Sequence, residues 1–167
     1  PISMAMKNLK GAISPKDRKR FHDLGYQRAV ADLNSVLRSD LVVMSGLRAC
    51  VSEAWAALQR QSGLPLGLVI VGNDAVAVDA VATTLVGCEP MGVEQIRVAH
   101  EKGWGCADLS EMHLTSDVSI EALRAQIVEG IFQARSRATR RTSLPLVIHE
   151  FDACTGCRVA LFNAINQ

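Results

Sequence analysis

The chain has 167 residues, of which 49% are hydrophobic and 21% are charged, and its formal net charge is +1. This composition is typical of one globular domain with a hydrophobic core rather than of a disordered chain. The near-neutral balance argues against a dedicated nucleic-acid or membrane-surface binder, because such proteins are usually more basic. No apolar run approaches the length of a membrane span and no signal-peptide core is visible, so we expect a cytoplasmic protein.

Four short apolar runs have the length and composition of buried strands. They cover residues 41–44, 68–71, 112–115 and 146–149. Helical patterns lie between and around them, over residues 14–38 with a break near residue 25, and over 50–60, 75–85, 93–102, 120–138 and 155–165. The alternation predicts a three-layer α/β domain over residues 1–167, with a mainly parallel sheet of four or five strands.

The segment over residues 66–87 is the most distinctive part of the chain. An apolar run ends at Gly72-Asn73-Asp74, and a nearly all-apolar helix follows, which is half of a βαβ unit. Asp74 is placed to cap that helix. Because ligands of open α/β sheets bind beyond the carboxyl ends of strands, Gly72, Asn73 and Asp74 are predicted to lie at a ligand site.

Asp79 is the one charged residue of the predicted helix over residues 75–85. A carboxylate on such an apolar helix is partly buried and must be paired or hydrogen-bonded. One interpretation is that Asp79 ties down a neighbouring loop by accepting backbone N–H groups. The other is that it faces a ligand or a lysine, with Asp79 or Asp74 acting as a catalytic acid or base.

Lys7, Asn8, Lys10 and Gly11 lie close together in a segment that we expect to be irregular or extended. Two ammonium groups, an amide and a flexible glycine can bind a carboxylate or a phosphate. The alternative is that the two lysines are solvated surface residues, as lysines usually are.

Five cysteines, at positions 50, 88, 106, 154 and 157, do not form the pattern of a secreted disulfide framework. Cys154 and Cys157 make a CxxC at the start of a predicted helix. They are interpreted as two ligands of an iron–sulfur or zinc site, as a redox dithiol, or as inert thiols. Further metal ligands would have to come from the other cysteines, from His149, or from another copy of the chain in a homo-oligomer.

Three blocks of the sequence resemble an uncharacterised prokaryotic family, the one catalogued as domain of unknown function 362. Residues 7–11 are similar to its K-N-L-x-G opening, and residues 72–80, GNDAVAVDA, to its G-x-D-x-V-A-x-D-A core. Residues 96–109 are similar to its helix followed by a G-x-G turn. Members often contain, or lie beside, ferredoxin-type iron–sulfur modules, so the resemblance favours metal binding by the CxxC. It also places the two lysines beside Asp74 and Asp79, and it implies no reaction.

Three functional expectations follow. The leading one is a redox-associated protein with a redox partner, in which Cys154 and Cys157 bind an iron–sulfur cluster or another thiophilic metal such as zinc. The second is an enzyme that binds a small anionic molecule, with Asp74 and Asp79 as its catalytic residues. Its ligand-binding residues would be Lys7, Asn8, Lys10, Gly72 and Asn73. The third is a non-catalytic interaction module.

Overall fold

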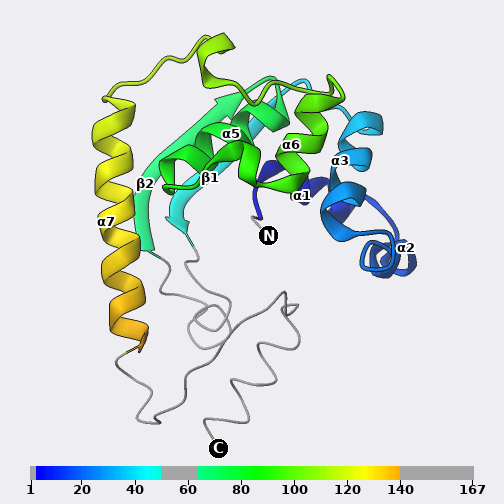
Figure 1. Ribbon diagram of the computed structural model, residues 1–167, viewed down its shortest axis with the longest axis horizontal. Helices are drawn as coiled ribbons and strands as arrows, with labels where there is room; N and C mark the ends of the chain where they lie inside the picture. The colour runs from blue at the N-terminus through cyan, green and yellow to red at the C-terminus, as the bar shows by residue number, and fades with distance from the viewer. Residues whose placement is uncertain (1–2, 50–63, 140–167) are drawn as a thin grey trace, which may run out of the picture. The chain divides into compact units, whose positions relative to one another are not determined.

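The computed structural model describes residues 3–49 and 64–139 (Figure 1). The chain forms two compact units, Pro1–Ser45 with Leu68–Val128, and Gly46–Gly67 with Glu129–Gln167. All the sites considered below lie in the first unit. The prediction of one domain over residues 1–167 stays a prediction.

The sheet of the described residues has only two strands, β1 (Val42–Ala49) and β2 (Leu64–Gly72), and they pair antiparallel. The predicted three-layer sandwich with a mainly parallel sheet of four or five strands is therefore wrong. Residues 112–115 form a loop in which Leu114 is exposed, because a run of four residues is too short to specify a strand. The predicted strand over residues 146–149, like the predicted helices over 50–60 and 155–165, lies outside the described residues.

The described α-helices are, in chain order, α1 (Ala5–Asn8), α2 (Pro15–Arg20), α3 (Tyr26–Val36), α5 (Ala75–Leu85), α6 (Glu94–Glu101) and α7 (Ile120–Thr139). Three 3₁₀ turns join them, η1 (Leu9–Ala12), η2 (Pro90–Gly92) and η3 (Leu109–Glu111). The prediction of an irregular or extended opening is wrong for residues 5–12, which are helical. A four-residue helix has too little periodicity to be recognised in a sequence.

After residue 12, the helix boundaries agree with the signals in the sequence better than the sheet does. Ser14 caps α2, since its Oγ accepts a hydrogen bond from the backbone N–H of Asp17 at 3.3 Å. Gly25, with a φ of 81°, separates α2 and its following turn from α3, which confirms the predicted break. The predicted helices that correspond to α5, α6 and α7 are also confirmed, with ends shifted by one residue at most.

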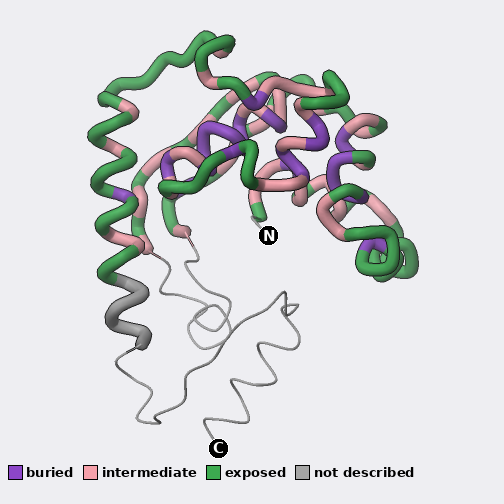
Figure 2. Tube along the Cα trace, viewed as in Figure 1, coloured by how far each residue is buried: buried purple, intermediate pink, exposed green. Residues whose placement is uncertain are grey.

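The core of the first unit lies among α1, α3, α5 and α6 (Figure 2). Its buried members are Met6, Phe21, Ala29, Val30, Ala31, Val76, Ala80, Ile96, Val98, Ala99 and Ala107. The other side of α5 packs against the end of β2, where a methyl group of Val78 lies 2.8 Å from the position of a Cβ on Gly72. Because α5 is covered on both sides, it is apolar nearly all round, as its sequence shows.

The two strands alternate between half-buried and exposed residues, as expected for a sheet covered on one face. Within the first unit, the exposed positions are largely aliphatic: Leu41, Val43, Val69 and Val71. The opposite face packs toward α5. None of the helices in the ranges 3–49 and 64–139 is both long and apolar enough to cross a lipid bilayer.

Candidate functional site

Asp79 lies on α5 with no exposed surface, and its carboxylate accepts hydrogen bonds from the first two residues of α1. Oδ1 lies 2.7 Å from the backbone N of Ala5, and Oδ2 lies 3.2 Å from the backbone N of Met6. The side chain of Gln95, on α6, also hydrogen-bonds to Asp79. Asp79 therefore ties α1 to α5 and satisfies N–H groups that have no partner within so short a helix. A catalytic role for Asp79 stays a prediction.

Burial raises the pKa of Asp79 to about 7, although the hydrogen bonds from Ala5, Met6 and Gln95 act in the opposite direction. No cation among the described residues forms an ion pair with this carboxylate. Desolvation therefore outweighs hydrogen bonding, and Asp79 changes its charge near neutral pH.

Asp74 uses both carboxylate oxygens to bind backbone N–H groups. Oδ1 accepts from Val76 at 2.7 Å and from Ala77 at 3.3 Å, which caps α5 as predicted. Oδ2 accepts from Cys106 at 2.7 Å and so fixes the loop that follows α6. Neighbouring Asn73 is exposed and its side chain forms no hydrogen bond with the described residues. The catalytic role of Asp74 and the ligand contacts of Gly72 and Asn73 stay predictions.

The two lysines of the first motif meet over the ring of Tyr26, at the start of α3. Lys10 Nζ lies 4.5 Å from the ring centre, and Lys7 Nζ lies 5.3 Å from it. Lys10 Nζ is also 5.3 Å from the ring centre of Phe21, and Lys7 Nζ donates a hydrogen bond to Ser3. We call Lys7, Lys10 and nearby Arg18 the basic cluster.

The basic cluster has no counter-charge within the described part of the chain. None of its three side chains forms an ion pair there, and Arg18 uses its Nε to donate to the backbone O of Ile13 at 3.0 Å. The pKa of Lys10 is lowered by burial first, and then by the charges of Lys7 and Arg18. The charges of Lys7 and Arg18 therefore lie close enough to Lys10 to repel its ammonium group. Asn8 is exposed, and its side chain forms no hydrogen bond with the described residues.

The residues predicted to form one site are only partly brought together. No hydrogen bond or ion pair within the described ranges joins the basic cluster to Asp74 or Asn73. Asp79 is linked to the cluster through the backbone of α1, on which Lys7 lies. The predicted site thus consists of a buried carboxylate, a capped turn and a basic cluster whose two lysines are half-buried.

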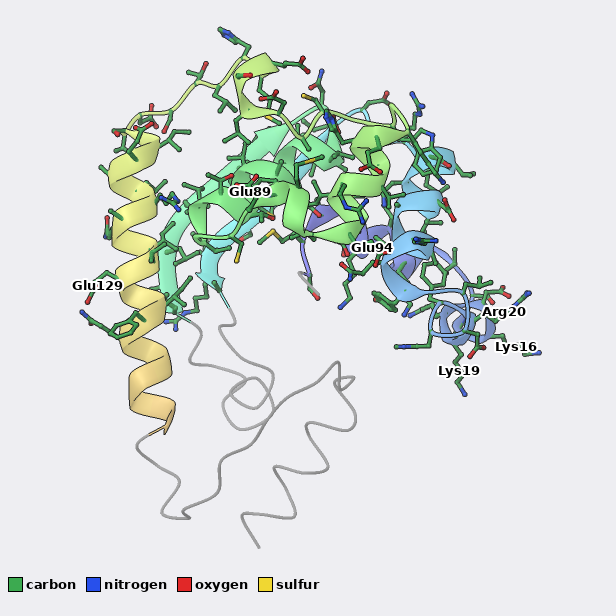
Figure 3. The ribbon with its side chains drawn as sticks, in the orientation of Figure 1. Lys16, Lys19, Arg20, Glu89, Glu94 and Glu129 are labelled. Atoms are coloured by element: carbon green, nitrogen blue, oxygen red, sulfur yellow. The ribbon has the colours of Figure 1, made fainter. Side chains whose placement is uncertain are left out.

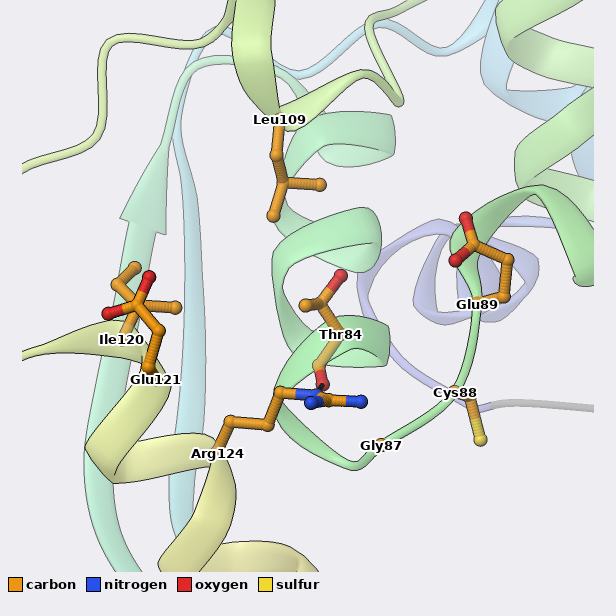
Figure 4. Close-up of a pocket in the computed structure, with 8 residues that line it drawn as sticks. All are labelled: Thr84, Gly87, Cys88, Glu89, Leu109, Ile120, Glu121 and Arg124. Atoms are coloured by element: carbon orange, nitrogen blue, oxygen red, sulfur yellow. Dashed lines mark hydrogen bonds between the residues drawn. The ribbon is translucent and has the colours of Figure 1, made fainter.

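A separate pocket of about 340 Å³ opens between the end of α5 and the start of α7 (Figure 4). It is lined by Thr84, Gly87, Cys88, Glu89, Leu109, Ile120, Glu121 and Arg124. Arg124 Nε donates to the backbone O of Thr84 at 3.1 Å, so the guanidinium partly serves to join the two helices. Cys88, one of the possible further metal ligands, lines this pocket, and none of the predicted catalytic or anion-binding residues does.

The predicted metal site falls outside the structural description. Cys154, Cys157 and His149 belong to residues that are not described, as does Cys50. Cys88 and Cys106 are free thiols, and no group of three or more His, Cys, Asp or Glu side chains within the described ranges could bind a metal. Iron–sulfur or zinc binding therefore stays a prediction.

A family model described as Domain of unknown function (DUF362) matches residues 1–84. The chain belongs to this family. The resemblance read from the sequence is thereby confirmed, and the matched part of this family member contains the basic cluster, Asp74 and Asp79. No curated protein and no solved structure matches the chain.

Sequence reasoning missed the aromatic rings that hold the lysines, and it missed Arg18. Tyr26 is the one tyrosine of the chain and begins a helix, but its separation from Lys10 matches no known spacing rule. Only the packing of α3 against α1 and η1 brings the ring under the two ammonium groups. A rare aromatic residue at a helix start was the single available signal.

Proposed function

We propose that this protein binds a small anionic molecule at the basic cluster of Lys7, Lys10 and Arg18. The observation that supports the proposal is the gathering of two ammonium groups over Tyr26, with the charge of Arg18 near Lys10 and with no ion pair to a carboxylate in the described residues. Like charges held together repel, and an anion between them would relieve that repulsion.

The contacts of the cluster favour this use. A cation–π contact orients an ammonium group over a ring but does not neutralise its charge. Lys7 and Lys10 are thus positioned while they remain able to form charge-assisted hydrogen bonds. The Nη groups of Arg18 offer the planar donor pair that suits carboxylate and phosphate oxygens.

The proposal is for binding rather than for catalysis. Asp74 and Asp79 were the candidate acid and base, and each uses both of its oxygens to accept backbone N–H groups. A general base must reach the proton that it removes. An enzymatic role would therefore require one of these carboxylates to leave its present partners.

Calorimetric titration with sulfate and with phosphate tests the proposal. In Lys7→Gln/Lys10→Gln, two charge-assisted hydrogen bonds are lost, so we expect affinity to fall about tenfold or more. The matched control is Lys16→Gln/Lys19→Gln, which changes the net charge equally at exposed positions on α2 (Figure 3). An equal fall in both variants, or no binding by the wild type, would contradict the proposal.

We also propose that Cys154 and Cys157, the CxxC, bind an iron–sulfur cluster or another thiophilic metal in a reducing cytoplasmic setting. A redox partner would exchange electrons with that cluster or metal. The spacing of the two thiols favours it, and so does the odd number of cysteines. Protein purified without oxygen should contain iron and sulfide, or zinc, and should lose them in Cys154→Ser/Cys157→Ser. Cys88→Ser, which changes an exposed thiol, is the control. Protein that contains no metal after purification without oxygen would contradict this proposal.

A further inference from the structure

Helix α1 is fastened to the core by the fully buried side chain of Met6 and by hydrogen bonds, two of which the buried carboxylate of Asp79 accepts. Ala5 and Met6 donate their N–H groups to Asp79, while Asn34 Nδ2 donates to the backbone O of Met6 at 3.0 Å. Lys7 is the next residue along α1, and Lys10 lies in η1, which follows without a break. Asp79 therefore helps to position both ammonium groups, together with Met6, Asn34 and the ring of Tyr26.

The environment of Asp79 contains polar groups but no counter-ion. The titratable or charged residues on the helices and 3₁₀ turns packed against α5, and on neighbouring α3, are Lys7, Tyr26, Arg28, Asp32, Glu94, Arg97, His100, Glu101 and Glu111. Lys7 contacts Ser3 and Tyr26, and the ion pairs of the others are made elsewhere, with Arg28 bound to Glu94 and Arg97 to Glu101. His100 Nδ1 accepts from the backbone N–H of Ala107, and Asp32 pairs with Lys102. None of these groups forms an ion pair with Asp79.

We propose that Asp79 is a positioning residue for the anion site, which holds α1 and the basic cluster in place when it is neutral and loosens them when it is ionised. The inference rests on the proposed anion binding. A neutral carboxyl group can still accept one N–H of α1 while it donates its proton to the amide oxygen of Gln95, which can rotate to receive it. An ionised carboxylate in the same place is a buried charge without a cation, and lifting α1 would let water reach it.

The direction of the effect follows from linkage. Burial holds the pKa of Asp79 at about 7 while α1 is in place, and solvation would return it toward the ordinary value of 3.8 once α1 lifts. Raising the pH therefore favours the lifted form. Between pH 6 and pH 8, the equilibrium constant for lifting is expected to rise by about tenfold.

Amide hydrogen exchange tests the behaviour of α1 without any ligand. In the wild type, the protection factors of Ala5 and Met6, corrected for intrinsic exchange, should fall by up to about tenfold between pH 6 and pH 8. In Asp79→Asn, which resembles the neutral form, they should stay constant. Asp32→Asn, which removes an exposed carboxylate on α3, should behave as the wild type does.

Sulfate binding tests the consequence for the site, because sulfate keeps the same charge from pH 6 to pH 8. The measurement uses a Lys10→Arg/His22→Gln background, which replaces two other ionisable side chains near Tyr26, since the ring centres of His22 and Tyr26 lie 5.1 Å apart. In that background, affinity should fall with rising pH by up to about tenfold. When Asp79→Asn is added, the sulfate affinity should no longer depend on pH. It should stay at the value that the background variant shows at pH 6.

The two proposals fail in different ways. If Asp79→Asn leaves the pH dependence of both measurements unchanged, the role of Asp79 is overturned and the anion site stands. If the wild type binds no sulfate at any pH, the anion site is overturned, and the role proposed for Asp79 fails with it even where the exchange data show that α1 loosens. If Asp79→Asn does not fold, constant protection of Ala5 and Met6 in the wild type overturns the inference, and a fall that occurs mainly below pH 7 and levels off above it supports it.

Discussion

A Cβ atom on Gly105 would lie 2.5 Å from Oδ1 of Asp74, so these two residues are in contact in a way that only glycine permits. The next residue, Cys106, donates its N–H to the other oxygen of the same carboxylate. Asp74 thus caps α5 and fixes the loop after α6 at once. The turn that is most distinctive in the sequence joins two segments more than thirty residues apart along the chain, Cys106 being separated from Asp74 by 32 positions.

Gly105→Ala should destabilise the protein by about 1–3 kcal/mol, because the added methyl group would overlap Asp74 and the side chain of Val76. Chemical denaturation measures the change. Gly11→Ala is the matched control, since nothing lies within 4 Å of a Cβ at that position. A stability of Gly105→Ala equal to that of the control would show that the loop moves freely away from Asp74.

Asp74→Ala should lower stability by about 1–3 kcal/mol, because it removes the cap of α5 and leaves the N–H of Cys106 without its acceptor. Asp117→Ala is the comparison. That aspartate follows the loop over residues 112–115, is exposed, and forms no hydrogen bond with the described residues. Thermal unfolding of the two variants should separate them clearly, and equal midpoints would contradict the assigned role of Asp74.

Asp79→Asn should alter how stability depends on pH. Between about pH 4 and pH 7, the folded protein keeps a proton on Asp79 that the unfolded chain has released, because the folded pKa is about 7 against an ordinary 3.8. Wild-type stability therefore falls as the pH rises through this window and is level above it. Asp79→Asn lacks this fall. From about pH 4 to pH 7, its free energy of unfolding should therefore rise relative to that of the wild type by up to about 4 kcal/mol. Parallel pH profiles for the variant and the wild type would rule this out.

Thr83→Val should leave stability unchanged or raise it by up to about 1 kcal/mol. The Thr83 hydroxyl is fully buried and finds no hydrogen-bond partner among the described residues, and valine has the same shape without the polar atom. Thr84→Val is the control, because Thr84 Oγ1 donates to the backbone O of Ala80 at 3.0 Å. A clear loss of stability in Thr83→Val would mean that its hydroxyl has a partner.

Part of the candidate site could be predicted from the sequence, and the reason lies in local chemistry. Asp74 follows an apolar run and precedes an apolar helix, which is enough to identify a cap. Asp79 is a lone charge on an apolar helix, which is enough to predict burial and hydrogen bonding, and both are observed. Which backbone groups it binds, and that the lysines lie over Tyr26, depend on contacts between segments far apart in the chain.

The sequence by itself determined the boundaries of α5, α6 and α7, the cap at Asp74 and the membership of the family, because each depends on residues close together in the chain. It did not determine the sheet. Apolar runs of four residues are compatible with a strand or with a loop, and the pairing direction of two strands is set by how the whole chain packs. Only the tertiary structure decided that β1 and β2 run antiparallel. It also decided that Asp79 accepts hydrogen bonds from the backbone of α1 and not from the turn before α5.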